Sequence, residues 1–199
     1  IAVSLALGVV EPYASGIGGE GYMVAVMADG REVAIDFRST APALANYANL
    51  DAAGGLREVR YTPKGHCIAG VPAGIDQARE LARLPLDVLA APAIRLAEEG
   101  FEVNETFATV NMDRWEVLYQ TAPEFLNDGM PWAQGEIYRN PELARTLRIL
   151  AEEGATAYYD GELAGSLDEF MRKNDGWVRK SDLQSYRALV RQPIEGRYR

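Results

Sequence analysis

The sequence has 199 residues, of which 48% are hydrophobic and 25% charged, a balance typical of a globular protein and not of a disordered or fibrous one. Acidic residues outnumber basic ones by 29 to 20, and the net charge of −9 argues against nucleic acid or an anionic membrane as a partner. One cysteine, Cys67, and one histidine, His66, are too few for an internal disulfide or a structural zinc site. We therefore expect no metal site and no cofactor.

The chain opens on an apolar run, residues 1–10, that precedes Glu11-Pro12. The run has no basic residues before it and is too short to cross a bilayer, so we expect neither a secretion signal nor a membrane span. We expect a helix that ends before Pro12, because proline disfavours the helical conformation of the preceding residue. A sequence that starts without Met inside a helix is expected to be a fragment of a longer protein, so we expect residues 1–199 to form a single partial domain.

A β-hairpin is predicted next. Residues 22–28 and 32–37 are strand-like, and Asp29-Gly30 between them is a turn signal. The first strand is apolar on both faces, which predicts a layer of structure on each side of it. In the second strand Asp36 and Arg38 share one face, and the other face carries the apolar residues Val33, Ile35 and Phe37.

Beyond Ala41 the sequence is predicted to be mostly helical. A first apolar stripe ends at Gly100, and Pro92 within it must kink the helix or begin a second one. A second helix is expected to begin at Asn140-Pro141-Glu142 and to end at Gly154. A third stripe follows Asp160-Gly161. The residues expected to be buried are Leu86, Leu89, Ala93, Leu96 and Ala97 in the first stripe, Leu143, Leu147 and Leu150 in the second, and Leu163, Leu167, Phe170 and Met171 in the third.

The end of the chain carries weaker signals. Ser181 could cap a further helix, and the tail from Pro193 to Arg199 is expected to be extended. Together these patterns predict an α+β fold with an antiparallel sheet and a mostly helical C-terminal portion.

The loop Gly16–Gly21, with the sequence GIGGEG, matches the dinucleotide-binding pattern G-x-G-x-x-G. A dinucleotide site needs a strand before the loop and a helix after it, whereas here a helix enters and a strand leaves. We therefore expect the glycines to supply positive φ angles or a close approach of another segment. Such a loop beside a strand end could also form the floor of a substrate pocket.

Arg38 is the candidate binding residue. It follows a strand whose other face is apolar, and Ala41-Pro42 comes soon after it, so its surroundings should be rigid. A guanidinium binds a carboxylate through two parallel hydrogen bonds, which suits an amino-acid-like substrate. The alternative is an ion pair with Asp36 or with another acid.

Other candidate residues have simpler explanations. His66 and Cys67 are neighbours that would point to opposite faces of an extended segment, and a lone cysteine usually behaves as a small buried hydrophobe. Glu98-Glu99 and Glu152-Glu153 precede glycines at predicted helix ends, where acidic pairs are usually solvated. The sequence therefore shows no complete catalytic site.

A series of motifs nevertheless resembles one family. In chain order they are EPYASGIGGEGYM, IDFRSTAP, GVPAG, PAIRLAEEGFEV, NPELARTL, EEGATAYYDGELA, and SDLQSY with RQPIEGRYR. They are similar, in order and spacing, to the landmarks of gamma-glutamyltranspeptidases, and the resemblance covers essentially Ile1 to Arg199.

The resemblance implies a fragment of the large subunit of an N-terminal nucleophile hydrolase, a four-layer αββα sandwich made as a precursor that cleaves itself. The family's nucleophile, a threonine at the start of the smaller subunit, would lie outside this chain, so no catalytic residue is expected within it. Arg38, in the family's DFR motif, would hold the α-carboxylate of a glutathione-like γ-glutamyl donor. Water, amino acids or peptides would be acceptors, the smaller subunit would be the protein partner, and relatives suggest a periplasmic or extracellular location.

Two positions depart from the family pattern. The family usually has Glu directly after the arginine, where this chain has Ser39, and a glycine where this chain has Glu20. These changes leave two alternatives open: an acylase of the same fold acting on another amide, similar to cephalosporin acylases, and a non-catalytic homologue that serves as a binding module.

Overall fold

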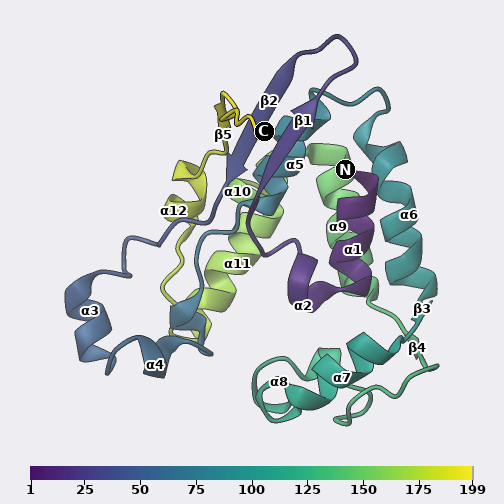
Figure 1. Ribbon diagram of the computed structural model, residues 1–199. Helices are drawn as coiled ribbons and strands as arrows, with labels where there is room; N and C mark the ends of the chain where they lie inside the picture. The colour runs from purple at the N-terminus through teal and green to yellow at the C-terminus, as the bar shows by residue number, and fades with distance from the viewer. Residues whose placement is uncertain (199) are drawn as a thin grey trace.

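The computed structural model describes residues 1–198, so the last residue of the predicted extended tail, Arg199, lies outside the described residues. A three-stranded antiparallel sheet has β2 (Glu32–Phe37) in its centre, with β1 (Gly21–Val26) on one side and β5 (Leu189–Arg191) on the other (Figure 1). The predicted hairpin is confirmed, although β1 ends two residues earlier than expected. β5 joins chain segments that are far apart in the sequence and has no counterpart in the sequence-based prediction.

The hairpin turn fixes the register of the two long strands. Met27 N–H donates to the Arg31 carbonyl (2.8 Å), and Gly30, with a φ of 84°, donates its N–H to the Met27 carbonyl (2.9 Å). From this turn the ladder runs back to a last pair between Gly21 and Phe37. The residues just beyond this pair, on the two chain segments that leave the hairpin, belong to the candidate site.

One face of the sheet packs against α5 (Val71–Arg79) and carries Ile35, which is 1% exposed. The opposite face has no cover within residues 1–198: Tyr22, Val24 and Val26 are each about two-thirds exposed. Residues 1–198 therefore supply a layer on one side of β1 only. An apolar pattern shows that a face is suited to burial, but it does not show which chain segment buries it.

Three helices pack together beside the sheet: α1 (Ala2–Val10), α6 (Leu86–Glu99) and α9 (Pro141–Glu153) (Figure 1). Small side chains on α6 allow close packing, and the cluster is made of Leu5, Val9, Ile75, Leu86, Ala90, Ala93, Ala97, Ala144 and Leu147. α6 continues through Pro92 as a single helix. At the start of α9, the predicted cap is confirmed because the Asn140 side chain accepts a hydrogen bond from Leu143 N–H (2.9 Å).

A second helical group contains α10 (Ala155–Tyr159), α11 (Glu162–Lys173) and α12 (Lys180–Ser185). Its core contains Ile68, Ala73, Tyr159, Ala164, Met171, Val178, Leu183 and Tyr186. Phe170, expected in this core, is 52% exposed, whereas Ala164 and Met171, two helical turns apart, define the buried stripe. The cap predicted at Ser181 is also wrong, because α12 begins at Lys180 with Arg179 as its N-cap.

The remaining elements are short. α7 (Glu105–Asp113) and α8 (Trp115–Thr121) lie at the opposite end of the molecule from the hairpin (Figure 1). Phe107 of α7 packs there in a cluster with Val103 and Tyr138. No helix within residues 1–198 is long and apolar enough to cross a membrane. The short elements are α2 (Pro12–Ser15), α3 (Tyr47–Ala52), α4 (Leu56–Val59), a 3₁₀ turn at Pro63–Gly65, β3 (Phe101–Glu102), α7 (Glu105–Asp113), α8 (Trp115–Thr121), a 3₁₀ turn at Pro123–Phe125, and β4 (Ile137–Tyr138).

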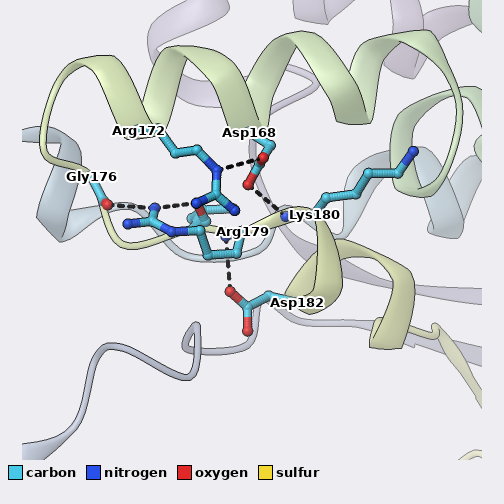
Figure 2. A network of polar contacts seen from close by, with 7 residues as sticks. Asp168, Arg172, Gly176, Arg179, Lys180 and Asp182 are labelled. Atoms are coloured by element: carbon cyan, nitrogen blue, oxygen red, sulfur yellow. Dashed lines mark hydrogen bonds and ion pairs between the residues drawn. The ribbon is translucent and has the colours of Figure 1, made fainter.

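A polar network links α11 to the start of α12 (Figure 2). Asp168 accepts hydrogen bonds from Arg172 Nε (2.8 Å) and from the Lys180 backbone N–H (3.0 Å). Asp182 accepts one from the Arg179 N–H (2.9 Å) and another from the Ala43 N–H (3.0 Å). Two carboxylates thus fix the beginning of α12, and one of them also binds the segment that follows β2 and Arg38.

The network predicts a loss of stability in acid. The hydrogen bond from Arg172, supported by the Lys180 N–H, lowers the pKa of Asp168 below its ordinary value of 3.8. Below that value the unfolded chain takes up the proton first, so the stabilisation is complete above pH 3.8 and is lost as the pH falls further. We expect Asp168→Asn to lose less stability than the unmodified protein between pH 7 and pH 3, measured by urea unfolding. Glu169→Gln, on the exposed side of α11, is the control, and equal losses in all three proteins would contradict the prediction.

A second prediction concerns the close approach of α5 to β2. A Cβ on Gly70, just before α5, would lie 1.8 Å from the Phe37 carbonyl oxygen and 2.5 Å from the Tyr186 hydroxyl. At Gly18 the same atom would meet nothing within 4 Å. We expect Gly70→Ala to cost about 1–3 kcal/mol of stability or more, and Gly18→Ala to change stability by less than about 0.5 kcal/mol. Thermal unfolding of the two variants tests this, and similar midpoints would show that the segments separate easily.

Candidate functional site

Arg38 lies one residue beyond the end of β2, and Glu20 lies one residue before β1. Because Gly21 pairs with Phe37, Glu20 and Arg38 face each other just past the ladder. Arg38 Nη1 lies 2.6 Å from Glu20 Oε1. The Arg38 side chain is 55% exposed and that of Glu20 is 29% exposed, so the pair lies at the protein surface. Neighbouring residues still contact both side chains.

Ser39 holds the other oxygen of Glu20. The Ser39 backbone N–H donates to Oε2 (2.7 Å), and the Ser39 hydroxyl donates to the same atom. The hydroxyl bond is the main cause of a lowered Glu20 pKa, with the Ser39 N–H and the Arg38 charge acting in the same direction. Glu20 is therefore an anion throughout the neutral range, held in direct contact with Ser39.

The alternative to a binding role for Arg38 is an ion pair with Asp36 or with another acid. Asp36 does not form this ion pair. Its Oδ1 accepts the Arg38 backbone N–H (3.2 Å), and its Oδ2 lies 2.8 Å from Nε of Arg191 on β5. The Arg38 N–H is the largest influence that lowers the pKa of Asp36, and Arg191 adds to it. The guanidinium of Arg38 pairs instead with Glu20, because cross-strand neighbours lie closer together than residues two apart on one strand.

The aromatic ring of Tyr22 completes the surroundings of the guanidinium. Arg38 Cζ lies 5.9 Å from the ring centroid, within the range of a cation–π contact. Tyr22 pairs with Asp36 across the ladder, so its ring is diagonal to Arg38 on the same sheet face.

Tyrosine hydroxyls fix the backbone at Arg38. The Tyr186 hydroxyl donates to the Arg38 carbonyl (2.9 Å), and the Tyr186 ring stacks on that of Tyr159 with centroids 5.2 Å apart. The Tyr159 hydroxyl in turn donates to the Ala69 carbonyl (2.7 Å). Burial raises the pKa of both tyrosines, so both hydroxyls keep their protons and remain donors. The expected rigid scaffold around Arg38 is therefore present.

The glycine loop is anchored to the start of α5. The Gly19 carbonyl accepts hydrogen bonds from the N–H groups of Gly70 (2.9 Å) and Val71 (3.1 Å), and the Ala73 N–H donates to the Tyr159 hydroxyl (3.3 Å). Since Pro72 has no N–H, every donor at this helix start is used within the chain. The helix end therefore has no N–H group left for a phosphate, in agreement with the rejection of a dinucleotide site.

The loop glycines serve for close approach and not for positive φ. None of Gly16, Gly18, Gly19 and Gly21 has a positive φ. A Cβ on Gly21 would lie 2.9 Å from the Phe37 ring, and one on Gly16 would lie 2.8 Å from the Pro12 carbonyl. Of the two roles expected for these glycines, the structure supports only the second.

The other candidates form no catalytic group. Cys67 is exposed, contrary to the expectation of a buried cysteine, and His66 Nδ1 lies 3.2 Å from the Thr62 carbonyl. The acidic pairs at positions 98–99 and 152–153 are exposed, as expected. Ser39 with Glu20 is a hydroxyl bonded to a carboxylate, but a carboxylate of lowered pKa is a weak general base. Among the described residues, the site thus offers a guanidinium beside a fixed carboxylate and no activated nucleophile.

Comparison with known proteins covers the whole chain. The family model for gamma-glutamyltranspeptidase matches residues 1–199. The glutathione hydrolase proenzyme of Escherichia coli K12 is 34% identical over 207 residues, an alignment that covers 100% of this chain and 36% of that protein. The chain thus spans little more than a third of the length of this relative.

Two solved structures are similar over the full chain. The gamma-glutamyltranspeptidase of Helicobacter pylori superimposes with a TM-score of 0.92 at 30% identity, and the match covers 100% of this chain and 59% of that one. A cephalosporin acylase from Bacillus halodurans gives a TM-score of 0.90 at 30% identity, covering 100% of this chain and 39% of the other. These matches confirm the predicted fold class, α+β and part of an N-terminal nucleophile hydrolase sandwich.

Proposed function

The chain belongs to the gamma-glutamyltranspeptidase family, and from that premise we propose that residues 1–199 form one partial domain, the donor-binding part of an enzyme that transfers or hydrolyses γ-glutamyl groups. The donors are glutathione-like γ-glutamyl compounds, and the acceptors are water, amino acids or peptides. The observation that carries the proposal is the position of Arg38, an exposed guanidinium on a backbone fixed by Tyr186 and Asp36.

Arg38 has the properties that a carboxylate-binding residue needs. Its Nη1 bonds to Glu20, and no described residue hydrogen-bonds to Nε or Nη2. That edge of the guanidinium can donate two parallel hydrogen bonds to the α-carboxylate of a donor. The fixed backbone reduces the ordering that binding requires, which favours affinity.

The covalent chemistry is proposed to lie outside this chain. A threonine at the start of a smaller subunit, made from the same precursor, would attack the γ-carbonyl carbon with its hydroxyl oxygen. Its own α-amino group would take the proton, as a weak hydroxyl nucleophile requires. The γ-amide C–N bond would then break as the α-ammonium group returns the proton to the leaving amine. An acceptor amine or water would next cleave the γ-glutamyl ester and regenerate the threonine hydroxyl. Residues 1–199 would position the donor, and the smaller subunit would be their protein partner.

An acylase acting on another amide is the second candidate. It is supported by the similarity to the Bacillus halodurans cephalosporin acylase and by the two changed residues, Glu20 and Ser39, beside Arg38. The two candidates differ in what Arg38 does. A γ-glutamyl enzyme needs it for the donor's α-carboxylate, whereas an acylase for an uncharged acyl group does not.

The substitution Arg38→Lys separates these candidates in the complete enzyme. Lysine keeps the charge but loses the planar fork, so we expect kcat/KM for γ-glutamyl anilide to fall by about tenfold to a hundredfold, equivalent to ~1.5–3 kcal/mol. A donor without the α-carboxylate, 4-aminobutyryl anilide, should be affected little. The variant must fold and cleave its precursor normally. If it does so and keeps the original preference between the two donors, Arg38 has only a structural role and the acylase candidate is favoured.

The division of labour also predicts that the 199-residue chain is inactive by itself. Its described residues supply a binding site without an activated nucleophile. We expect no release of aniline from γ-glutamyl anilide above the buffer rate, while the complete enzyme is active under the same conditions. Turnover by the chain that persists through repeated purification would contradict the proposal.

A further inference from the structure

Aspartate is followed directly by glycine at positions 29–30, 128–129, 160–161 and 175–176. Such a pair can rearrange without an enzyme, because glycine has no side chain to hinder attack by its backbone nitrogen on the carboxyl carbon of the aspartate. All four pairs share this chemistry. The structure determines how easily each of them reaches the geometry that the attack requires.

In three of the pairs the glycine nitrogen is already engaged. Its N–H group donates a hydrogen bond to a backbone carbonyl that lies earlier in the chain. These bonds run from Gly30 to Met27 (2.9 Å), from Gly161 to Thr156 (2.9 Å) and from Gly176 to Met171 (2.7 Å). Each bond must break before the nitrogen can attack, which opposes the reaction.

The carboxylates of the same three pairs are engaged as well. Each accepts a hydrogen bond or forms an ion pair that holds the side chain in one orientation. The partners are the Arg31 N–H for Asp29 (3.0 Å), the Gln184 side-chain amide for Asp160 (2.6 Å) and Lys64 Nζ for Asp175 (2.6 Å). Both reacting groups are therefore restrained at positions 29, 160 and 175.

Asp128-Gly129 differs from the other pairs at both reacting groups. Within residues 1–198, the Gly129 N–H donates no hydrogen bond and the Asp128 carboxylate has no partner. Asp128 is exposed, so water reaches the pair. Its φ is 49° and that of Gly129 is 81°, and a positive φ is unfavourable for a residue that has a Cβ.

Few bonds hold this turn closed. Asn127 and Met130 form an isolated β-bridge, in which each N–H donates to the carbonyl of the other residue (2.8 and 2.9 Å). The indole N–H of Trp115, the first residue of α8, donates to the Gly129 carbonyl (2.8 Å). The turn at Asp29-Gly30, in contrast, closes the long ladder between β1 and β2. Local opening should therefore be easier at Asp128.

We propose that Asp128 is a site of spontaneous covalent modification, at which the folded protein converts an aspartyl residue to an isoaspartyl residue. The Gly129 nitrogen forms a bond to Asp128 Cγ. The nitrogen loses its proton and Cγ loses a hydroxyl group, which leave together as one water molecule and close a succinimide ring. Water then adds to one of the two ring carbonyls and cleaves its bond to the nitrogen.

The carbonyl that water attacks determines the product. Cleavage at Cγ restores aspartate, whereas cleavage at the backbone carbonyl carbon leaves the chain running through Cγ, which is isoaspartate. One water molecule leaves and one enters, so the mass of the protein is unchanged and no oxidant or reductant is needed. The extra backbone atom breaks the match between Asn127 and Met130, and the Trp115 bond at the start of α8 should be lost with it.

Peptide mapping of the complete enzyme after incubation at neutral pH tests the proposal. Electron-transfer fragmentation in a mass spectrometer distinguishes isoaspartyl from aspartyl residues at each of the four positions. We expect isoaspartate to form at Asp128 about two- to tenfold faster than at Asp29, Asp160 or Asp175, the factor by which one hydrogen bond opposes opening. In urea, where the folded structure is lost, the four rates should become similar.

Three variants control the experiment. Asp128→Glu keeps the charge but requires a larger and less favourable ring, so isoaspartate should disappear at this position alone. Asp29→Glu makes the same change at the other exposed turn and should leave the rate at Asp128 unchanged. Asp128→Asn should pass through the same succinimide faster, because ammonia leaves the amide more readily than water leaves the carboxyl group. This last variant keeps the test decisive if Asp128→Glu does not fold.

Two results would overturn the proposal. One is a rate at Asp29, Asp160 or Asp175 in the folded enzyme that equals or exceeds the rate at Asp128. The other is no isoaspartate at Asp128 in the folded enzyme while the chain in urea forms it, which would show that the closed turn protects the pair. Neither result depends on the substrate of the enzyme, so the proposed function is tested separately.

Discussion

The register of β1 on β2 determines which charges meet at the candidate site. The three-residue turn at positions 28–30 sets the pairs along the hairpin, and counting outward from its closing pair, Met27 and Arg31, brings Glu20 opposite Arg38. A shift of one residue would send every side chain of one strand to the other face of the sheet. Arg38 would then point towards the layer occupied by α5, and Glu20 would lose its partner. The site therefore depends on a turn at the far end of the hairpin.

Arg38 is held in place through its backbone more than through its ion pair. An exposed pair such as Glu20–Arg38 contributes about 0–1 kcal/mol to stability. The bonds to the Arg38 carbonyl and N–H come from Tyr186 and Asp36, and the close packing at Gly70 holds the same segment against α5. Because the fold depends little on the ion pair, its two partners can exchange bonds with a ligand without loss of structure.

The sequence predicts the elements whose signals are local and long. α1, α6 and α9 have apolar stripes or caps within one segment, and the hairpin has a turn sequence between two strands. β5 is missed because three exposed residues carry no pattern and find their place only by pairing with β2. α5 is missed because GVPAG, rich in glycine and proline, is typical of a loop, although Pro72 suits the first helical turn and the glycines admit Phe37.

The same distinction applies to the candidate site. Arg38 could be singled out because one short segment of sequence shows both its position directly after a strand and its chemistry. The sequence offers Asp36, two residues away, or another acid as its partner, and the structure shows Glu20, eighteen residues away. A two-residue turn at Asp29-Gly30 would pair Gly21 with Arg38, whereas the observed turn of residues 28–30 pairs Gly21 with Phe37 and brings Glu20 opposite Arg38. The bond from Ser39, in contrast, depends on how the chain turns after β2, which no sequence pattern specifies.

The ion pair changes how the Arg38 guanidinium interacts with any anion. Two unit charges 4 Å apart interact by about 4 kcal/mol at an effective dielectric constant of 20. A carboxylate that approached Arg38 would gain the attraction of the guanidinium but meet the repulsion of Glu20, in a chain whose net charge is already −9. The neighbouring carboxylate therefore lowers the net attraction of Arg38 for a simple anion, and the two hydrogen bonds from Ser39 fix that carboxylate in place.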